Sequence, residues 1–119
     1  MTANRKGKDG ERAVASWLKA QGFPRAERRL SGAGNDKGDI TGIPGVVIEA
    51  KVRRTLALAE WVDQLTEEMD NADADIGAIV AKRRGKSDVA EWYAIMPASV
   101  FASLLRQAGW GDPDYREDP

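Results

Sequence analysis

The 119-residue sequence contains no histidine and no cysteine. These absences exclude zinc fingers, zinc ribbons, thiolate nucleophiles, Ser-His-Asp triads and nucleases that depend on histidine. Any chemistry must therefore rely on carboxylates, lysines, hydroxyls or a metal ion held by oxygen ligands. The lack of cysteine is also compatible with a reducing compartment.

Long apolar runs are absent as well. No stretch approaches the roughly 20 residues that a membrane-spanning helix needs. The basic N-terminus leads into Gly, Asp and Glu rather than into the apolar core of a signal peptide. We therefore expect a cytoplasmic protein with no membrane partner. Hydrophobic residues at 42% and charged residues at 31% are typical of a globular domain.

A surplus of positive charge is also missing, because the formal net charge is −1. Taken alone, this value argues against a nucleic-acid binder, since Lys and Arg that neutralise phosphates supply most non-specific affinity. The charges are segregated along the chain, however. Residues 1–54 carry 12 basic and 6 acidic side chains, whereas residues 55–81 carry no basic and 7 acidic ones. The near-neutral total therefore conceals a basic first half.

Hydrophobic periodicity predicts the secondary structure. Amphipathic helices are expected at residues 4–21, with Gly22 as the stop signal, at residues 58–69 and after Pro97. Strands are expected at residues 26–30, 39–43, 46–52, 76–81 and 89–96. The 39–43 and 46–52 strands form a hairpin, and the apolar run 76–81 is expected to be buried on both faces.

This order predicts a single domain, residues 1–111, built as a mixed sheet covered by helices. Residues 112–119 are rich in Pro and Asp and predict an acidic, flexible tail.

The predicted hairpin brings reactive side chains together. Glu49 and Lys51 are two residues apart, so they project from the same face of their strand, and Asp39 on the partner strand can lie beside them. Two carboxylates and a lysine are the groups needed to hold a divalent metal ion and to position a water. The backbone carbonyl of Ala50 can complete the metal shell. In the simpler alternative, Glu49 and Lys51 are a solvated pair and Asp39 is a turn residue.

Glu11 is a third acidic candidate. It precedes Val14 by three residues and Leu18 by seven, so it lies on the core-facing stripe of the first helix. A carboxylate aimed at the sheet is costly without a cation, and a metal site would supply one. The alternative is an ion pair with Arg12 or Lys8, or a charge favoured by the helix dipole.

Short blocks in the first half follow one another in the order of a known family. They are Arg5-Lys6-Gly7-x3-Glu11-Arg12, Gly22-Phe23, Arg29 with Ser31-Gly32, Asp39-Ile40 and Ile48-Glu49-Ala50-Lys51-Val52. With these blocks the sequence resembles the archaeal-type Holliday junction resolvases of the PD-(D/E)XK nuclease superfamily, a type with viral and phage members. The resemblance covers residues 4–54 and is only topological beyond them. Gly38 departs from the superfamily pattern, which has Pro there, and the chain is less basic than resolvases usually are.

The resemblance implies a restriction-endonuclease-like α/β fold, with a mixed β-sheet flanked by helices in the order αβββαββα. It also implies a homodimeric, Mg²⁺-dependent endonuclease, with Mn²⁺ as a substitute, that resolves four-way DNA junctions by paired nicks. The products would carry 5′-phosphate and 3′-hydroxyl ends. For a phage-encoded member, the compartment would be the host cytoplasm.

Residue roles carry over by position in the resemblance. The implied catalytic residues are Glu11, Asp39, Glu49, Lys51 and the loop hydroxyl Ser31. The implied metal ligands are Asp39, Glu49, the Ala50 carbonyl and, through a water, Glu11. The implied DNA-contacting residues are Arg5, Lys6 and Arg29.

Residues outside these blocks leave alternatives open. The basic turn with Lys82, Arg83 and Arg84 suits DNA phosphates, and solubility explains it equally well. Gln64 faces either the site or the solvent, with solvent the simpler interpretation. The acidic outer face of the helix at 58–69 is expected to be a solvated surface.

Aromatic residues late in the chain are similarly ambiguous. Trp92, Tyr93 and Trp110 fit either a dimer interface or the core.

The sequence therefore favours a metal-dependent endonuclease for branched DNA. Two alternatives stay open. One is another structure-specific or nicking nuclease of the same superfamily, and the other is a catalytically silent DNA-binding module that kept the fold.

Overall fold

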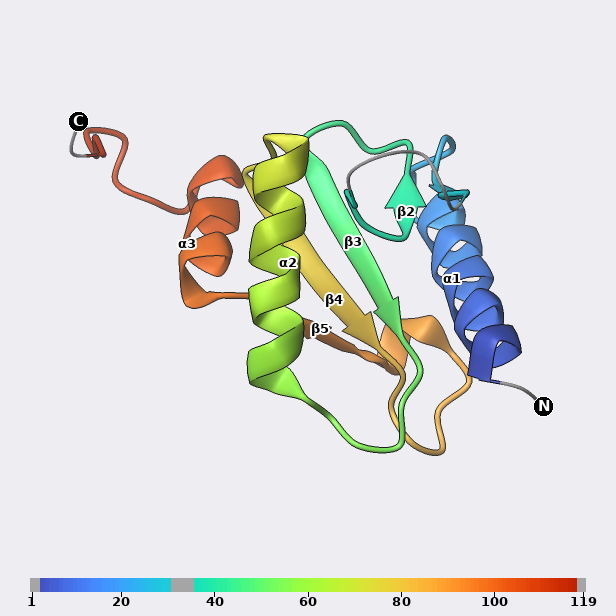
Figure 1. Ribbon diagram of the computed structural model, residues 1–119. Coiled ribbons are helices and arrows are strands. Elements are labelled where there is room, and N and C mark those ends of the chain that lie inside the picture. Colours follow the sequence, from blue (N-terminus) through green and yellow to red (C-terminus); the bar gives the residue numbers. More distant parts are fainter. Residues whose placement is uncertain (1–2, 31–35, 118–119) are drawn as a thin grey trace.

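The computed structural model of the chain describes residues 3–30 and 36–117. It contains a five-stranded mixed sheet flanked by helices (Figure 1), which confirms the predicted α/β class. The helices are α1 (Ala3–Ala20), α2 (Leu58–Ala72) and α3 (Ala98–Gln107). The strands are β1 (Glu27–Arg28), β2 (Ile40–Thr41), β3 (Val46–Lys51), β4 (Ile76–Ala81) and β5 (Tyr93–Ile95). Among the described residues, no helix has the length and apolarity needed to cross a membrane.

The strands lie in the sheet in chain order, β1-β2-β3-β4-β5. Only β3 and β4 are parallel, in register from Val46 opposite Ile76 to Lys51 opposite Ala81. The other neighbouring pairs are antiparallel. A parallel pair needs a long crossover connection, and α2 supplies it. The antiparallel β2–β3 pair confirms the predicted hairpin.

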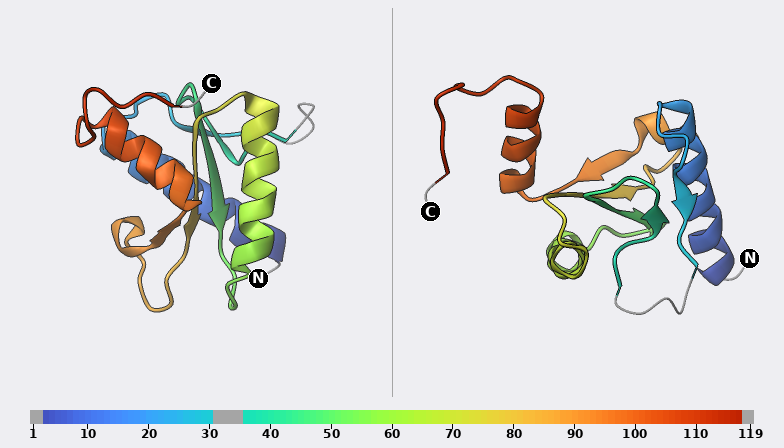
Figure 2. Two further views of the ribbon diagram at one scale, coloured as in Figure 1. Left: turned by 90° about the vertical axis from the view of Figure 1, so that its left-hand side faces the viewer. Right: turned by 90° about the horizontal axis from the view of Figure 1, so that it is seen from above.

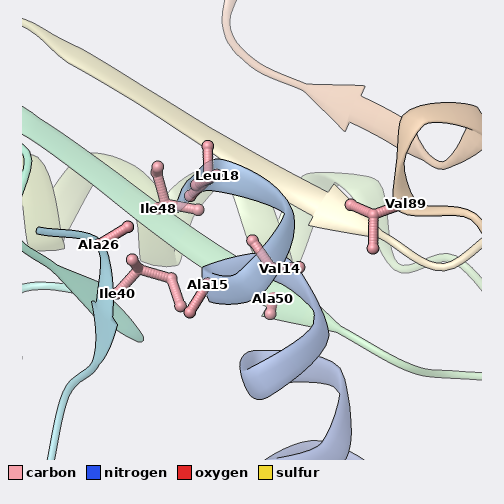
Figure 3. Close-up of a cluster of buried hydrophobic side chains, with 8 residues drawn as sticks. All are labelled: Val14, Ala15, Leu18, Ala26, Ile40, Ile48, Ala50 and Val89. Carbon is pink, nitrogen blue, oxygen red and sulfur yellow. The ribbon is translucent and has the colours of Figure 1, made fainter. Parts of the chain in front are cut away.

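Helices α1 and α2 cover different faces of the sheet. Side chains alternate along β3, so Ile48 and Ala50 face α1, while Val47 faces α2. The α1 cluster (Figure 3) contains Val14, Ala15, Leu18, Ala26, Ile40, Ile48, Ala50 and Val89. The α2 cluster contains Val47, Trp61, Leu65, Ile79 and Ala81. Figure 2 shows α1 and α3 at opposite ends of the sheet and α2 on one of its faces. The central strand β3 is therefore held from both sides.

Helix α1 ends at the predicted stop. Gly22 has φ +103°, a conformation that suits a residue without a Cβ. The N–H of Gly22 donates to the Lys19 carbonyl (3.3 Å), and the N–H of Phe23 donates to the Leu18 carbonyl (3.0 Å). These bonds satisfy carbonyls at the helix end and turn the chain toward β1.

Four strand predictions need correction. Strands β1 and β2 have two residues each, shorter than the predicted 26–30 and 39–43. The first half of the predicted strand 89–96 is the 3₁₀ turn η1 (Val89–Glu91), because the Asp88 side chain accepts from the N–H of Ala90 (3.0 Å) and caps a turn. The strand at 76–81 is fully buried only on the α2 face, since its other face is half-buried.

The hairpin depends on a close contact at Gly42. This residue has φ +96°, and a Cβ built on it would collide with the backbone carbonyl of Arg25, in the segment that leads into β1. Gly45, in the same hairpin, also has a positive φ (+80°), but nothing lies within 4 Å of a Cβ built there. Substitution of Gly42 would therefore introduce both a backbone clash and a strained φ, whereas substitution of Gly45 would introduce the strained φ alone.

We predict that Gly42→Ala lowers the free energy of unfolding by roughly 2–4 kcal/mol, because backbone must move to admit the methyl group. Gly45→Ala should cost only about 1 kcal/mol, from its left-handed conformation alone. Urea denaturation followed by circular dichroism measures both values. Equal losses in the two variants would show that the Arg25 contact is unimportant.

Candidate functional site

Strand β3 presents Glu49 and Lys51 on the sheet face that α2 covers. Both continue the alternation begun by Val47, which packs against α2. Glu49 is only 3% exposed, and Lys51, at the end of the strand, is half-buried. The alternative of a solvated pair on an open surface is therefore wrong for Glu49.

Asp39 approaches Glu49 from the other arm of the hairpin. Its backbone N–H donates to the Ile48 carbonyl (2.9 Å), and its Oδ2 accepts from the backbone N–H of Ala50 (2.9 Å). Strands β2 and β3 are paired at only one described position, Ile40 opposite Ile48. The Ala50 N–H lies beyond this pair, and it donates to the Asp39 side chain. The Asp39 carboxylate is thereby fixed beside Glu49. This is the juxtaposition that the hairpin predicts.

Glu11 reaches Asp39 from α1. Its Oε2 lies 3.5 Å from Nη1 of Arg28 on β1, and its side chain is only 20% exposed. Burial and then the negative charge of Asp39 raise the pKa of Glu11, while Arg28 acts in the opposite direction. The expected alternative partner, Arg12, pairs instead with Asp9 at 3.4 Å. The inward-facing position of Glu11 is thus confirmed, with Arg28 as the cation beside it.

Glu68 of α2 is a functional candidate that the sequence reasoning missed. We expected a solvated acidic face on this helix, but Glu68 is 1% exposed and lies beside Glu49. It follows Trp61 by seven residues and Leu65 by three, so it falls on the apolar stripe of the helix. The spacing argument that singled out Glu11 would have found Glu68.

Burial of these carboxylates changes their protonation. Desolvation, the largest cause, and the neighbouring Glu68 and Asp39 carboxylates together raise the pKa of Glu49 to about 11. Desolvation is also the main cause that raises the pKa of Glu68. Oε1 of Glu49 and both carboxylate oxygens of Glu68 are buried without a hydrogen-bond partner. Unpartnered buried carboxylates are expensive, so a cation would stabilise this arrangement.

Asp36 completes a group that could bind a metal ion. Carboxylate oxygens of Asp36, Glu49 and Glu68 all lie within 4.8 Å of one another. Asp36 is exposed, and its backbone carbonyl accepts from Nδ2 of Asn71 on α2 (2.9 Å), which ties the segment before β2 to that helix. Asp36 falls between the predicted strands 26–30 and 39–43, and no sequence pattern indicates this contact.

Five carboxylates therefore form a continuous row, in which each lies beside the next. We call it the carboxylate row, and its members in spatial order are Glu11, Asp39, Glu49, Glu68 and Asp36. The row draws on α1, α2, β3 and the segment that precedes β2.

Lys51 lies at the edge of the carboxylate row. Its Nζ donates to Oε1 of Gln64 on α2 (3.1 Å) and lies 5.9 Å from the centre of the Trp61 ring. Gln64 is therefore half-buried and directed at Lys51, so the simpler expectation of solvent exposure is wrong. The ammonium group is held against α2 by these two contacts, on the face of β3 that also carries Glu49.

The basic residues line two cavities at the two ends of β3. A cavity of about 810 Å³ follows the strand and contains Lys6, Lys82 and Arg84, together with Arg53 and Arg54, which the sequence reasoning did not single out. A second cavity, of about 380 Å³, contains Arg29, Arg25 and Lys37. Arg83 lies outside both linings, with its guanidinium 6.0 Å from the Tyr93 ring.

The remaining candidates are placed as follows. Ser31 lies outside the described residues. Arg5 lies near the start of α1. Ala50 is buried in β3, with its N–H bonded to Asp39.

The chain matches no protein-family model, no curated protein and no solved structure with which it was compared. The likeness to the resolvases therefore rests on the sequence blocks described above.

The raised pKa of Glu49 predicts a pH-dependent stability. The unfolded carboxyl has a pKa of 4.5 and the folded one about 11, so the folded protein retains a proton that the unfolded chain releases. This stabilisation is complete below pH 4.5 and declines as the pH rises, by at most about 1.4 kcal/mol per pH unit. Glu49→Gln keeps the side-chain volume but removes the titratable carboxyl group. Its free energy of unfolding should be higher than that of wild type at pH 8 and should change less between pH 5 and 8.

Thermal and urea denaturation in the presence of a chelator measures this difference. Glu67→Gln, at an exposed position one residue before Glu68, is the matched control and should follow wild type. Parallel pH profiles for Glu49→Gln and wild type would contradict the assignment.

Proposed function

We propose that the protein is a divalent-metal-dependent endonuclease that hydrolyses phosphodiester bonds in branched DNA, most specifically in four-way junctions. The observation that carries the proposal is that Asp39 lies beside Glu49 with Glu11 against Asp39, while Lys51 projects from the same face of β3 two residues beyond Glu49. These are the groups that the resolvase resemblance assigns to catalysis. Buried carboxylate oxygens without partners support a cation at the same place.

The proposed roles follow from donor chemistry. Asp39 and Glu49 offer carboxylate oxygens and Ala50 its carbonyl, all hard ligands that suit Mg²⁺ or Mn²⁺, with Glu11 acting through a water. A bound ion would polarise a phosphoryl oxygen and acidify the attacking water. Lys51, held by Gln64 at 3.1 Å, can orient that water and offset the charge that develops on the phosphate. Ser31 keeps the catalytic role that the resemblance implies.

The basic cavities support a nucleic-acid substrate. Each of them gathers several cations at one end of β3, with the carboxylate row between the ends. Phosphates of a DNA strand on either side of the scissile bond would find cations there. We assign DNA contacts to Arg5, Lys6, Arg29, Lys82, Arg83 and Arg84, as the sequence indicates.

Paired nicks require two centres, so we propose a homodimer. Exposed apolar side chains on and around β5 and α3 support this proposal: Tyr93 is 44%, Phe101 55%, Leu105 40% and Trp110 80% exposed. Trp92 does not contribute, because it packs against the α1 cluster and its Nε1 donates to the Lys86 carbonyl (2.9 Å).

We predict that Asp39→Asn slows Mg²⁺-dependent cleavage of a synthetic four-way junction by at least about 100-fold, because a ligand charge is lost. The amide oxygen can still accept from the Ala50 N–H, so the fold should survive. Asp63→Asn, at an exposed position of α2, should cut at the wild-type rate. Single-turnover cleavage of a labelled junction measures the rates.

Other results would redirect the proposal. An unchanged rate in Asp39→Asn would remove Asp39 from the site. Equal cutting of four-way, flap, nicked and linear DNA would favour a different nuclease of the same superfamily. Binding to DNA without cleavage at any metal concentration would favour a silent binding module.

We also predict that DNA affinity falls steeply with salt despite the net charge of −1. Each phosphate contact contributes about 0.9 to the slope of log K against log salt. Lys82→Gln combined with Arg84→Gln, both in the larger cavity, should therefore reduce the slope by about 2. Arg116→Gln, in the segment after α3, is the control and should leave it unchanged. Fluorescence anisotropy over a salt series, with Ca²⁺ to prevent cleavage, measures the slope. An unchanged slope in the double variant would exclude the cavity from the DNA surface.

A further inference from the structure

Glu49 divides the carboxylate row into two arms. Asp39 and Glu11 lie on one arm, and Glu68 and Asp36 lie on the other. The proposed function uses only the first arm. The second arm contains the most deeply buried acidic side chain of the described residues, Glu68 at 1% exposure.

No salt bridge found in the described part of the chain reaches the second arm. None of the ion pairs found among the described residues involves Asp36, Glu49 or Glu68. Lys51, two residues beyond Glu49 on the same strand face, donates instead to Gln64. Both oxygens of Glu68 and one of Glu49 have no hydrogen-bond partner. If Glu68 served only to fill space, an apolar side chain of similar volume would be cheaper, so the arrangement points to a ligand.

We propose that Asp36, Glu49 and Glu68 form a second divalent-cation site, which shares Glu49 with the Asp39 site. The pairing of the two sites rests on the proposed function, whereas cation binding to the second site does not. Oxygens of the three carboxylates lie within 4.8 Å of one another, a spacing that one ion can bridge. Three carboxylates and no nitrogen or sulfur donor select a hard cation such as Mg²⁺ or Mn²⁺.

The surroundings suit such an ion. Oδ1 of Asp36 accepts from the N–H of Gly38 (3.0 Å), which orients the carboxylate and leaves Oδ2 for coordination. The Asn71 contact with the Asp36 carbonyl fixes the segment against α2. Asp36 itself is exposed, so an ion can enter on that side and keep some of its waters, as Mg²⁺ prefers. Glu49 would bridge the two ions, and paired ions can stabilise both the attacking and the leaving oxygen of a phosphodiester.

Titration of the protein with Mn²⁺ alone, followed by electron paramagnetic resonance in the absence of DNA, tests the proposal. Wild type should bind two ions per chain, and Glu68→Gln and Asp36→Asn should each bind one. Glu67→Gln, at an exposed position of the same helix, should bind two. Asp36→Asn changes an exposed side chain, so it remains informative if Glu68→Gln does not fold. Circular dichroism checks each variant.

The outcomes separate this proposal from the proposed function. If Asp39→Asn lowers the count and the two second-arm variants do not, the second site is overturned and the Asp39 site stands. If only the second-arm variants lower the count, the second site stands and the Asp39 site fails. If wild type binds no Mn²⁺, Glu49 and Glu68 are a buried acid pair that shares a proton, and the second site is overturned.

Discussion

The hydrogen bond from the backbone N–H of Ala50 to the Asp39 carboxylate (2.9 Å) is the interaction on which the arrangement of the carboxylate row depends. It forms where the β2–β3 ladder ends, so it replaces a strand contact with a side-chain contact. Because Asp39 is held there, Glu11 from α1 and Glu49 from β3 meet at the same edge. A longer β2 would pair with Ala50 through its backbone and leave no place for a carboxylate. The short strand is therefore part of the site.

The apolar core of the fold offsets the energetic cost of burying these carboxylates. Apolar clusters on both faces of β3 hold the strand between α1 and α2. Burial of each large aliphatic side chain contributes about 1.5–3 kcal/mol, and these contributions offset the cost of carboxylates placed inside. Leu65 and Ile79 are fully buried in the cluster that lies on the same sheet face as Glu49. The apolar side chains that stabilise the fold are thus neighbours of the buried carboxylates that destabilise it.

Local sequence patterns predicted much of this arrangement. Helical periodicity placed α1 and its stop at Gly22, and strand alternation placed Glu49 and Lys51 on one face. Capping by Asp88 converted the first half of the predicted strand 89–96 into η1, because a single side-chain hydrogen bond outweighed a weak β-pattern. The contact between Asp36 and Glu68 spans 32 positions of the chain and depends on how α2 crosses the sheet, so no local pattern reports it. Glu68 itself was readable from its spacing to Trp61 and Leu65.

Under the proposed function, the carboxylate row also determines the order in which the metal ion and DNA would bind. Phosphates and carboxylates have the same sign, and repulsion between like charges a few ångströms apart is strong where water is partly excluded. Under the proposed function, a DNA strand would settle over the row only after cations had reversed the local electrostatic field. The basic cavities at the two ends of β3 would attract the strand without neutralising the row between them. The proposed function thus implies sequential assembly, with the ion first and the polyanion second, so that the free metal concentration would set the association rate as well as the chemistry.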